Sequence, residues 1–158
     1  MATMGEILFK DGAGDVLQGP RENGSSFIYE FKTEVSLLTD GSSISLGRRR
    51  IDVFWIVKSI DELTPDLLRI LEQSQTCSEI IITLYRIGAE TGLHEPYFTY
   101  TFNEARIVAI SNWMNSVYDP TGAESPHFER IGIVARDISW NHIVAGKQLT
   151  IEQFGGER

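Results

Sequence analysis

The side chains that most often carry nucleophilic or metal chemistry are few in this chain. It contains one cysteine, Cys77, and three histidines, His94, His127 and His142. A metal site needs Cys and His at short, repeated spacings, and a reactive thiolate needs a base or cation beside it. None of the histidines lies near Cys77 in the sequence. We therefore expect the histidines at surface or loop positions. We expect the Cys77 thiol to be inert, and the open alternative is that a base distant in the sequence activates it.

Two other motifs have the residue types for catalysis or phosphate binding. Asp61 and Glu62 form a pair of acids, as general acid–base chemistry requires, and Glu157 lies near the C-terminus. Adjacent acids are also common on solvated turns, which is the interpretation we favour. The stretch Asp11–Gly14 lacks the Lys-Ser/Thr ending of a phosphate-binding loop, so we expect a hairpin turn there. The sequence thus predicts no enzyme, and no catalytic residue, cofactor or metal.

Composition narrows the remaining classes of protein. The 158 residues suit one domain. Acidic residues number 22 against 14 basic ones, a formal charge of −8, and nucleic-acid binding instead requires excess Lys and Arg. A single cysteine excludes an intrachain disulfide. The N-terminus has no apolar signal region, and no apolar stretch approaches the ~20 residues that span a bilayer. We expect a protein that is cytoplasmic when made and not inserted into a membrane.

Arg48, Arg49 and Arg50 form the one dense basic run of the sequence. The run suits a solvated strand entry that balances an acidic surface. It also suits contact with carboxylates of a neighbouring subunit, because Arg forms bidentate pairs with them. A nucleic-acid patch fits least well, given the net charge.

The three tryptophans have different expected roles. Trp55 and Trp140 lie in strand-like sequence and are expected in the core or barrel. Trp113 and Met114 lie in the long segment 111–128, which has no clear periodicity. Long segments of this kind in compact domains usually carry function, and exposed Trp and Met are enriched at protein interfaces. This pair is therefore an interface candidate.

Alternation of apolar and polar residues predicts mainly β structure. It is clearest in Phe27–Leu37, and Arg130–Ile143 changes the phase of its apolar residues part-way along. Such a phase change suits strands that bend from one sheet into the next. Further candidate strands are Glu6–Lys10, Asp15–Gln18, Ile51–Lys58, Glu79–Arg86, Tyr97–Ile110 with a bulge near Glu104–Arg106, and Gln148–Gln153.

One helix is well signalled. Thr64 suits the N-cap and Pro65 the first helical position, and apolar residues over 67–71 follow helical spacing. We expect this helix over about Thr64–Ser74. A helix of two to three turns is unstable alone, so it must pack against the sheets.

Together these elements predict a mainly β fold: two packed antiparallel sheets form a β-barrel-like domain, with the short helix on its side. No repeat or linker divides the chain, so residues 1–158 are expected to form a single domain. Long loops are expected at 36–50 and 111–128, and a flexible tail at 155–158.

The region around the helix start resembles a known family. A strand ending in Lys-Ser-Ile-Asp is followed by Thr-Pro-Asp-Leu at the start of the helix. This pattern is similar to that of the haemolysin-coregulated proteins (Hcp), the tube proteins of the bacterial type VI secretion system. The motif residues are Lys58, Ile60, Asp61, Thr64, Pro65 and Leu67. The segments Arg50–Ile51, Ile80–Tyr85, Tyr97–Ile110 and Glu129–Trp140 agree in order and spacing, so the resemblance covers about Ile7 to Ile143.

The resemblance implies a role in assembly. Hcp subunits form hexameric rings that stack into a tube, and a contractile sheath on a baseplate expels the tube with a spike protein at its tip. Small effectors ride in the ring lumen, and the tube is secreted without a signal peptide. Segments 36–50 and 111–128 correspond to the protruding loop and the variable late loop of the family. Candidate subunit or ring-stacking contacts in them are Leu38, Asp40, Arg48, Arg49, Arg50, Trp113, Met114 and Tyr118.

Two alternatives remain open from the sequence. The first is a tail tube protein of a related, phage-like contractile particle, which shares the ancestral fold. The second is a monomeric ligand-binding β-barrel or an enzyme without a recognisable motif. A clean monomer with a ligand-sized pocket would favour the second.

Overall fold

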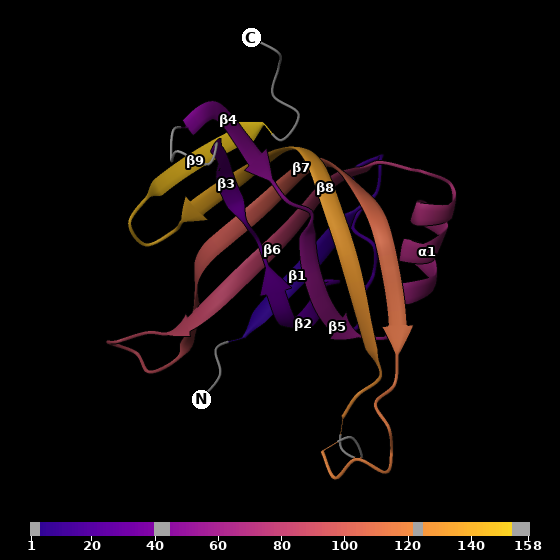
Figure 1. Ribbon diagram of the computed structural model, residues 1–158. Helices are drawn as coiled ribbons and strands as arrows, with labels where there is room; N and C mark the ends of the chain where they lie inside the picture. Colours follow the sequence, from indigo (N-terminus) through magenta and orange to yellow (C-terminus); the bar gives the residue numbers. More distant parts are fainter. Residues whose placement is uncertain (1–3, 40–44, 122–124, 153–158) are drawn as a thin grey trace.

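The computed structural model describes residues 4–39, 45–121 and 125–152, and the side chains of 38, 39 and 45–49 are outside that description. Asp40 and the expected tail at 155–158 lie outside the described residues. Within them there are nine strands and one helix (Figure 1). Their bounds are β1 Gly5–Lys10, β2 Ser26–Lys32, β3 Val35–Thr39, β4 Ser45–Ile51, β5 Phe54–Ser59, α1 Thr64–Glu72, β6 Cys77–Ile87, β7 His94–Trp113, β8 Phe128–His142 and β9 Lys147–Glu152.

Six antiparallel strands close into a barrel. Their order is β5, β2, β1, β6, β7, β8, and β5 also pairs with β8. This last pairing joins Phe54–Ser59 to Phe128–Ile133 and leaves no open edge between the two strands (Figure 1). β9 pairs with the other half of β8, while β3 and β4 form a separate two-stranded ribbon. The predicted mainly β, barrel-like fold with one helix on its side is confirmed.

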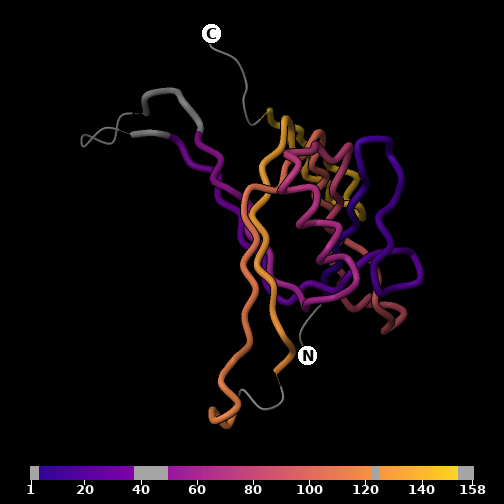
Figure 2. The backbone as a smooth tube through the Cα atoms, turned by 90° about the vertical axis from the view of Figure 1, so that its right-hand side faces the viewer, coloured from indigo at the N-terminus to yellow at the C-terminus, as the bar shows by residue number. Residues whose placement is uncertain are grey.

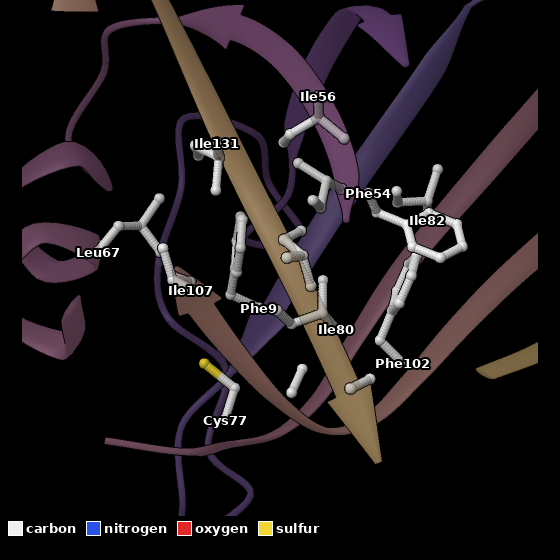
Figure 3. Close-up of a cluster of buried hydrophobic side chains, with 14 of the residues drawn as sticks. Phe9, Phe54, Ile56, Leu67, Cys77, Ile80, Ile82, Phe102, Ile107 and Ile131 are labelled. Atoms are coloured by element: carbon white, nitrogen blue, oxygen red, sulfur yellow. The ribbon is translucent and has the colours of Figure 1, made fainter. Parts of the chain in front are cut away.

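Alternate residues of the barrel strands fill the interior. β5 buries Phe54 and Ile56, and Phe54 meets Phe102 of β7 edge to face, with ring centroids 4.6 Å apart (Figure 3). The neighbouring strands contribute Ile7, Phe9, Ile80, Ile82, Ile131 and Ile133, all fully buried. Burial of each such side chain contributes roughly 1.5–3 kcal/mol, which makes this cluster the main source of stability.

Helix α1 covers one end of this core. Its buried residues Leu67 and Ile70 face the barrel, and Leu67 lies near Ile107 of β7 (Figure 3). The helix ends at Glu72 rather than Ser74, because Ser74 adopts a left-handed φ of 52°. The amides of Ser74 and Gln75 then bond the last free carbonyls, at 3.1 and 3.0 Å, which is a common way of ending a helix.

The N-cap prediction for Thr64 is wrong. Leu63 occupies the N-cap and makes no side-chain capping bond, while Thr64 is already helical. The side chain of Thr64 donates instead to Glu129. This partner is 65 positions away in the sequence, so a pattern of neighbouring residues could not predict it. The carboxylate of Asp61 accepts the Leu63 amide at 2.9 Å and so takes over part of the capping role.

One of the two segments expected as long loops is largely paired strand. Most of 36–50 belongs to the β3–β4 ribbon, whereas in 111–128 residues 111–113 continue β7, Phe128 begins β8, and residues 114–121 and 125–127 lie outside the strands, as expected. A segment that leaves the core has few other partners for its backbone amides and carbonyls, and strand pairing supplies them. The Phe27–Leu37 strand is correspondingly divided into β2 and β3, and Asp15–Gln18 contributes one bridge, between Val16 and Lys10.

The bulge expected near Glu104–Arg106 lies slightly further along β7. The pairing of β7 with β8 shifts between Ile107 and Ala109, which places the extra residue at Val108. Glu104 itself has a left-handed φ of 47°, which is uncommon for a residue with a Cβ atom. Glu104 lies where the buried positions of β7 change from an even number, Phe102, to odd numbers, Ala105 and Ile107.

Two arms extend from opposite ends of the barrel (Figure 2). The ribbon arm is the β3–β4 ribbon, which precedes β5 in the chain. The hairpin arm is the outer part of the β7–β8 hairpin, residues 111–121 and 125–128, and it leads into β8. Each arm therefore joins the chain next to one of the two strands that close the barrel.

Cys77 gives a direct test of the packing. The thiol is fully buried, and burial, with a smaller contribution from Asp11, raises its pKa to about 11 (Figure 3). At neutral pH it is therefore almost entirely protonated and unreactive. We expect thiol reagents to label the native protein very slowly and the urea-unfolded chain at once. Rapid labelling of the native protein would contradict this placement of Cys77.

Candidate functional site

The residues with potential nucleophilic or metal chemistry are not brought together. In the described part of the chain, no three His, Cys, Asp or Glu side chains form a set that could hold a metal ion. His142 is occupied at the β8–β9 turn, where its Nδ1 accepts the Ala145 amide at 3.1 Å. In a separate respect, no helix among the described residues is long and apolar enough to cross a membrane.

The motif residues, by contrast, meet at the seam where the barrel closes. Lys58 ends the inward-facing row of β5, and its register partner across the seam is Glu129 of β8. The Lys58 side chain has no exposed surface, and neither has that of Glu129. Lys58 Nζ lies 2.7 Å from Glu129 Oε2 and 2.8 Å from Asp61 Oδ1, and donates to the Ser59 carbonyl at 3.0 Å. One ammonium thus joins β5, β8 and the helix entry.

Neutral donors complete this seam cluster, which consists of Lys58, Asp61, Glu129, Thr64 and Ser26. Ser26 Oγ of β2 donates to Asp61 Oδ2 at 2.6 Å, and Thr64 Oγ1 donates to Glu129 Oε2 at 3.0 Å. The other oxygen of Glu129 is buried and accepts no hydrogen bond from the described residues. Two carboxylates share one lysine, so the cluster depends on the lysine and on these neutral donors to remain folded.

The remaining motif residues position the helix rather than contribute charge. Ile60 donates its amide to the His127 carbonyl at 2.9 Å, which ties the helix entry to the base of the hairpin arm. Pro65 occupies the first turn of α1 without losing a helical hydrogen bond, and Leu67 is buried in the core. The motif of the sequence is therefore a structural junction, in which Lys58, Thr64 and Leu67 are buried while Ile60 and Pro65 are exposed.

A second buried cluster fixes the chain between β1 and β2. Glu6 of β1 accepts from Tyr85 Oη at 2.6 Å and from Ser25 Oγ at 2.9 Å, and it pairs with Arg21. The Arg21 guanidinium also lies over the Phe27 ring, 4.2 Å from its centroid. Burial and the bond to Glu6 raise the pKa of Tyr85. This cluster, like the first, is structural.

The candidate contact residues within the described chain divide between the ribbon arm and the hairpin arm. Leu38 lies on β3 and Arg48, Arg49 and Arg50 on β4, all in the ribbon arm. Of these, the structure describes the side chain of Arg50, which is exposed and pairs with Asp52 at 2.7 Å. Arg50 is thus paired within its own chain, at a surface position where one ion pair contributes little stability.

The second group lies on the hairpin arm. Trp113 is at the end of β7, where its ring stacks on Phe128 with centroids 5.4 Å apart. Met114 and Tyr118 are 61% and 93% exposed, so these large side chains have almost no partner in the described chain. Asp119 accepts the amide and hydroxyl of Thr121 at 3.0 and 2.8 Å, which lowers its pKa. The arm therefore presents apolar side chains on an ordered turn.

Of the two positions expected for Trp55, the core or the barrel, the structure gives the barrel wall. Phe54, Ile56 and Lys58 point inward, so Trp55 points outward from the barrel instead of into the core. Its ring lies against Gly132 of β8, the strand on the other side of the seam. The sequence of β5 does not indicate which face of the strand points inward, because the residues on both faces are mainly apolar.

Glu129 is the site residue that local reasoning did not single out. A signal for it exists: Lys58 is in phase with the buried residues of β5, and Glu129 is in phase with Ile131 and Ile133 of β8. A charge in an inward phase must be paired to be buried. When two strands each carry a charged residue among their inward-facing residues, and the two charges are opposite, the strands are expected to be neighbours.

The seam cluster makes a stability prediction. Lys58→Met leaves two buried carboxylates without their cation, and we expect a loss of about 3–5 kcal/mol of unfolding free energy. Urea unfolding followed by circular dichroism measures it. The control is Lys10→Met, which removes a partly exposed ion pair with Glu79 and should cost at most about 1 kcal/mol. Equal losses in the two variants would contradict the role of the cluster.

Comparison with known proteins identifies the family. The family model described as "Type VI secretion system effector, Hcp" matches residues 9–142. The "Major exported protein" of Pseudomonas aeruginosa is 30% identical over 138 residues, covering 87% of this chain and 79% of the relative. Solved structures with this fold include Hcp1 of the E. coli EAEC 042 pathovar, with TM-score 0.85, 19% identity and coverage of 96% and 99% of the two chains. Hcp3 of Pseudomonas aeruginosa gives TM-score 0.74, 20% identity and coverage of 96% and 98%. The barrel, its seam motif and these matches agree: the chain belongs to the Hcp family of the type VI secretion system.

Proposed function

We propose that this chain, a subunit of the type VI secretion tube, closes into hexameric rings that stack end to end. The observation that carries the proposal is a closed Hcp barrel with an arm at each of two opposite ends (Figure 2). A closed ring needs one surface of each subunit to fit a different surface of the next. Arms that extend beyond their own barrel supply surface for such contacts.

A strand at the end of the sheet also supports self-association. Among the described strands, β9 pairs with β8 and lies at the end of the sheet order. An edge strand of this kind tends to pair with another chain unless it is covered. In the proposed ring and tube, adjacent copies cover such edges, and a lone barrel would leave them exposed to solvent.

The other components of the secretion machine are inferred from membership of the Hcp family. The tube works inside a contractile sheath on a baseplate, carries a spike protein at its tip and holds small effectors in its lumen. The subunit is made in the cytoplasm and exported by the machine without a signal peptide. A formal charge of −8 suits a subunit that must stay soluble before assembly. No bound nucleic acid, cofactor or membrane insertion is part of this function, and the Hcp family is one of structural tube proteins.

Negative-stain electron microscopy of the purified protein tests the proposal. We expect round particles with a central hole, and end-to-end stacks of them at high concentration. Light scattering of the same sample should give a mass six times that of the 17.8 kDa chain. A single-chain mass at all concentrations would overturn the ring and favour a monomeric binding barrel. Rings with genes of a phage-like particle beside the coding sequence would instead assign the tube to that particle.

The ribbon arm generates a prediction about stacking. Arg49→Glu with Arg50→Glu reverses two charges on β4, and we expect rings to persist while their stacking weakens. Contacts between exposed charges are screened, so stacking of the wild-type rings should also weaken at high salt. The control is Arg69→Glu on α1, an exposed Arg away from both arms. Unchanged tube length in the double variant, measured by electron microscopy, would contradict a stacking role for these residues.

A further inference from the structure

The outer face of the seam carries an unusual set of side chains. Trp55 and Val57 of β5 point outward, in the phase opposite to the buried residues. Lys32 of β2 and Gly132 of β8 are the register partners of Trp55 on its two sides. We call Lys32, Trp55, Arg130 and Gly132 the seam wall. It lies on the outside of the barrel, between the points where the two arms leave it.

Trp55 is held in one pose on this wall. A Cβ atom at position 132 would lie 2.8 Å from the Trp55 ring, so the ring can lie against the strand only because that residue is glycine. On the ring's face, the Arg130 guanidinium lies 3.9 Å from the ring centroid. A tryptophan already fixed in this way loses little side-chain freedom when a partner binds.

A cavity opens beside this tryptophan. It has a volume of about 320 Å³ and lies where the ribbon arm leaves the barrel. Its lining consists of Lys32, Glu34, Asp52, Val53, Trp55 and Arg130. The apolar ring and valine can accept an apolar side chain, and the other four lining residues are charged. Trp and Arg around a pocket are the residue types that contribute most to binding at protein interfaces.

The charges on this wall favour an acidic partner. Asp52 is neutralised by Arg50 at 2.7 Å, and Lys32 and Arg130 form no ion pair among the described residues. With Glu34 also in the lining, two cations face one carboxylate that Arg50 does not neutralise, which leaves a small positive excess. The chain as a whole has 22 acidic and 14 basic residues, so the rest of its surface carries an excess of carboxylates. A second copy of the chain therefore supplies the complementary charge.

The apolar surface also continues from the wall onto the hairpin arm. Tyr29 bonds Ser59 through its hydroxyl at 2.8 Å and meets Phe128 edge to face at 6.0 Å. Phe128 in turn stacks on Trp113, next to the exposed Met114. A stable interface covers roughly 800 Å² on each partner, which one pocket cannot supply. Apolar side chains at both ends of the seam, Trp55 and the Trp113–Phe128 pair, add to the area of the pocket, with the charged register partners of Val57, Glu30 and Arg130, between them.

We propose that the seam wall is one half of the ring-forming interface: a neighbouring copy seats an apolar side chain, flanked by carboxylates, in the cavity beside Trp55. The inference rests on the proposed function and adds to it the surface, the anchor residue and the chemistry of the contact. It assigns Arg130 and Lys32 to recognition of the neighbour's carboxylates. It assigns Gly132 to holding Trp55 in the binding pose.

Reversing the charge of Arg130 and displacing the Trp55 side chain test the proposal independently. Arg130→Glu should raise the protein concentration needed for half-assembly by at least about tenfold, measured by sedimentation equilibrium. Gly132→Ala displaces the Trp55 ring without changing any charge and should act in the same direction. The matched control is Arg69→Glu, which reverses an exposed Arg on α1. Circular dichroism and urea unfolding establish that each variant is folded before it is compared.

A labelling experiment keeps the test decisive if either variant unfolds. Lys32→Cys introduces an exposed thiol on the wall, and the native Cys77 is buried and does not compete. Modification of the new thiol should slow by at least about tenfold between diluted monomer and assembled protein. Equal rates, or normal assembly of folded Arg130→Glu and Gly132→Ala, would overturn the proposed wall while leaving the ring intact. A wild-type chain that stays monomeric would instead overturn the proposed function.

Discussion

The pairing of β5 with β8 is the constraint on which the rest of this structure depends. Without it, the six strands would form an open sheet with two free edges. The buried ammonium of Lys58 stabilises the pairing at its end, where it bonds Glu129 across the seam and Asp61 at the helix entry. An ion pair of this kind contributes little to stability compared with apolar residues of the same shape. Its effect is to fix which residues face each other across the closure.

The same seam sets the position of the two arms, which are the proposed contact surfaces. The ribbon arm leads directly into β5, and the hairpin arm leads directly into β8. Both arms are therefore attached to strands whose register is fixed by the seam cluster. Helix α1 begins at the same junction, through Asp61 and Thr64. A ring requires every copy of the subunit to present its contact surfaces at the same angle. A closed seam with a fixed register gives the arms the same direction in every copy.

Much of this architecture could be predicted from the sequence, and the failures have identifiable physical causes. Strand alternation and the helix signals gave the β class and the helix, since both depend on residues close in sequence. The role of Thr64 was missed because its partner, Glu129, is brought to it only by the fold. Whether Trp55 points into the core or outward from the barrel could not be predicted, because both faces of its strand are apolar. The ribbon arm was expected as a loop because polar, Arg-rich strands without a core face carry no clear alternation.

Hydrogen exchange of the backbone amides in β5 and in residues 128–133 of β8 tests the central claim most directly. If the seam cluster holds the barrel closed, these amides in the wild-type protein exchange as slowly as those of the β6–β7 pair. In Lys58→Met they should exchange through a separate, faster opening while the β6–β7 amides stay protected. Seam amides that already exchange faster than the β6–β7 pair in the wild-type protein, or that are unchanged relative to that pair in the variant, would contradict the account.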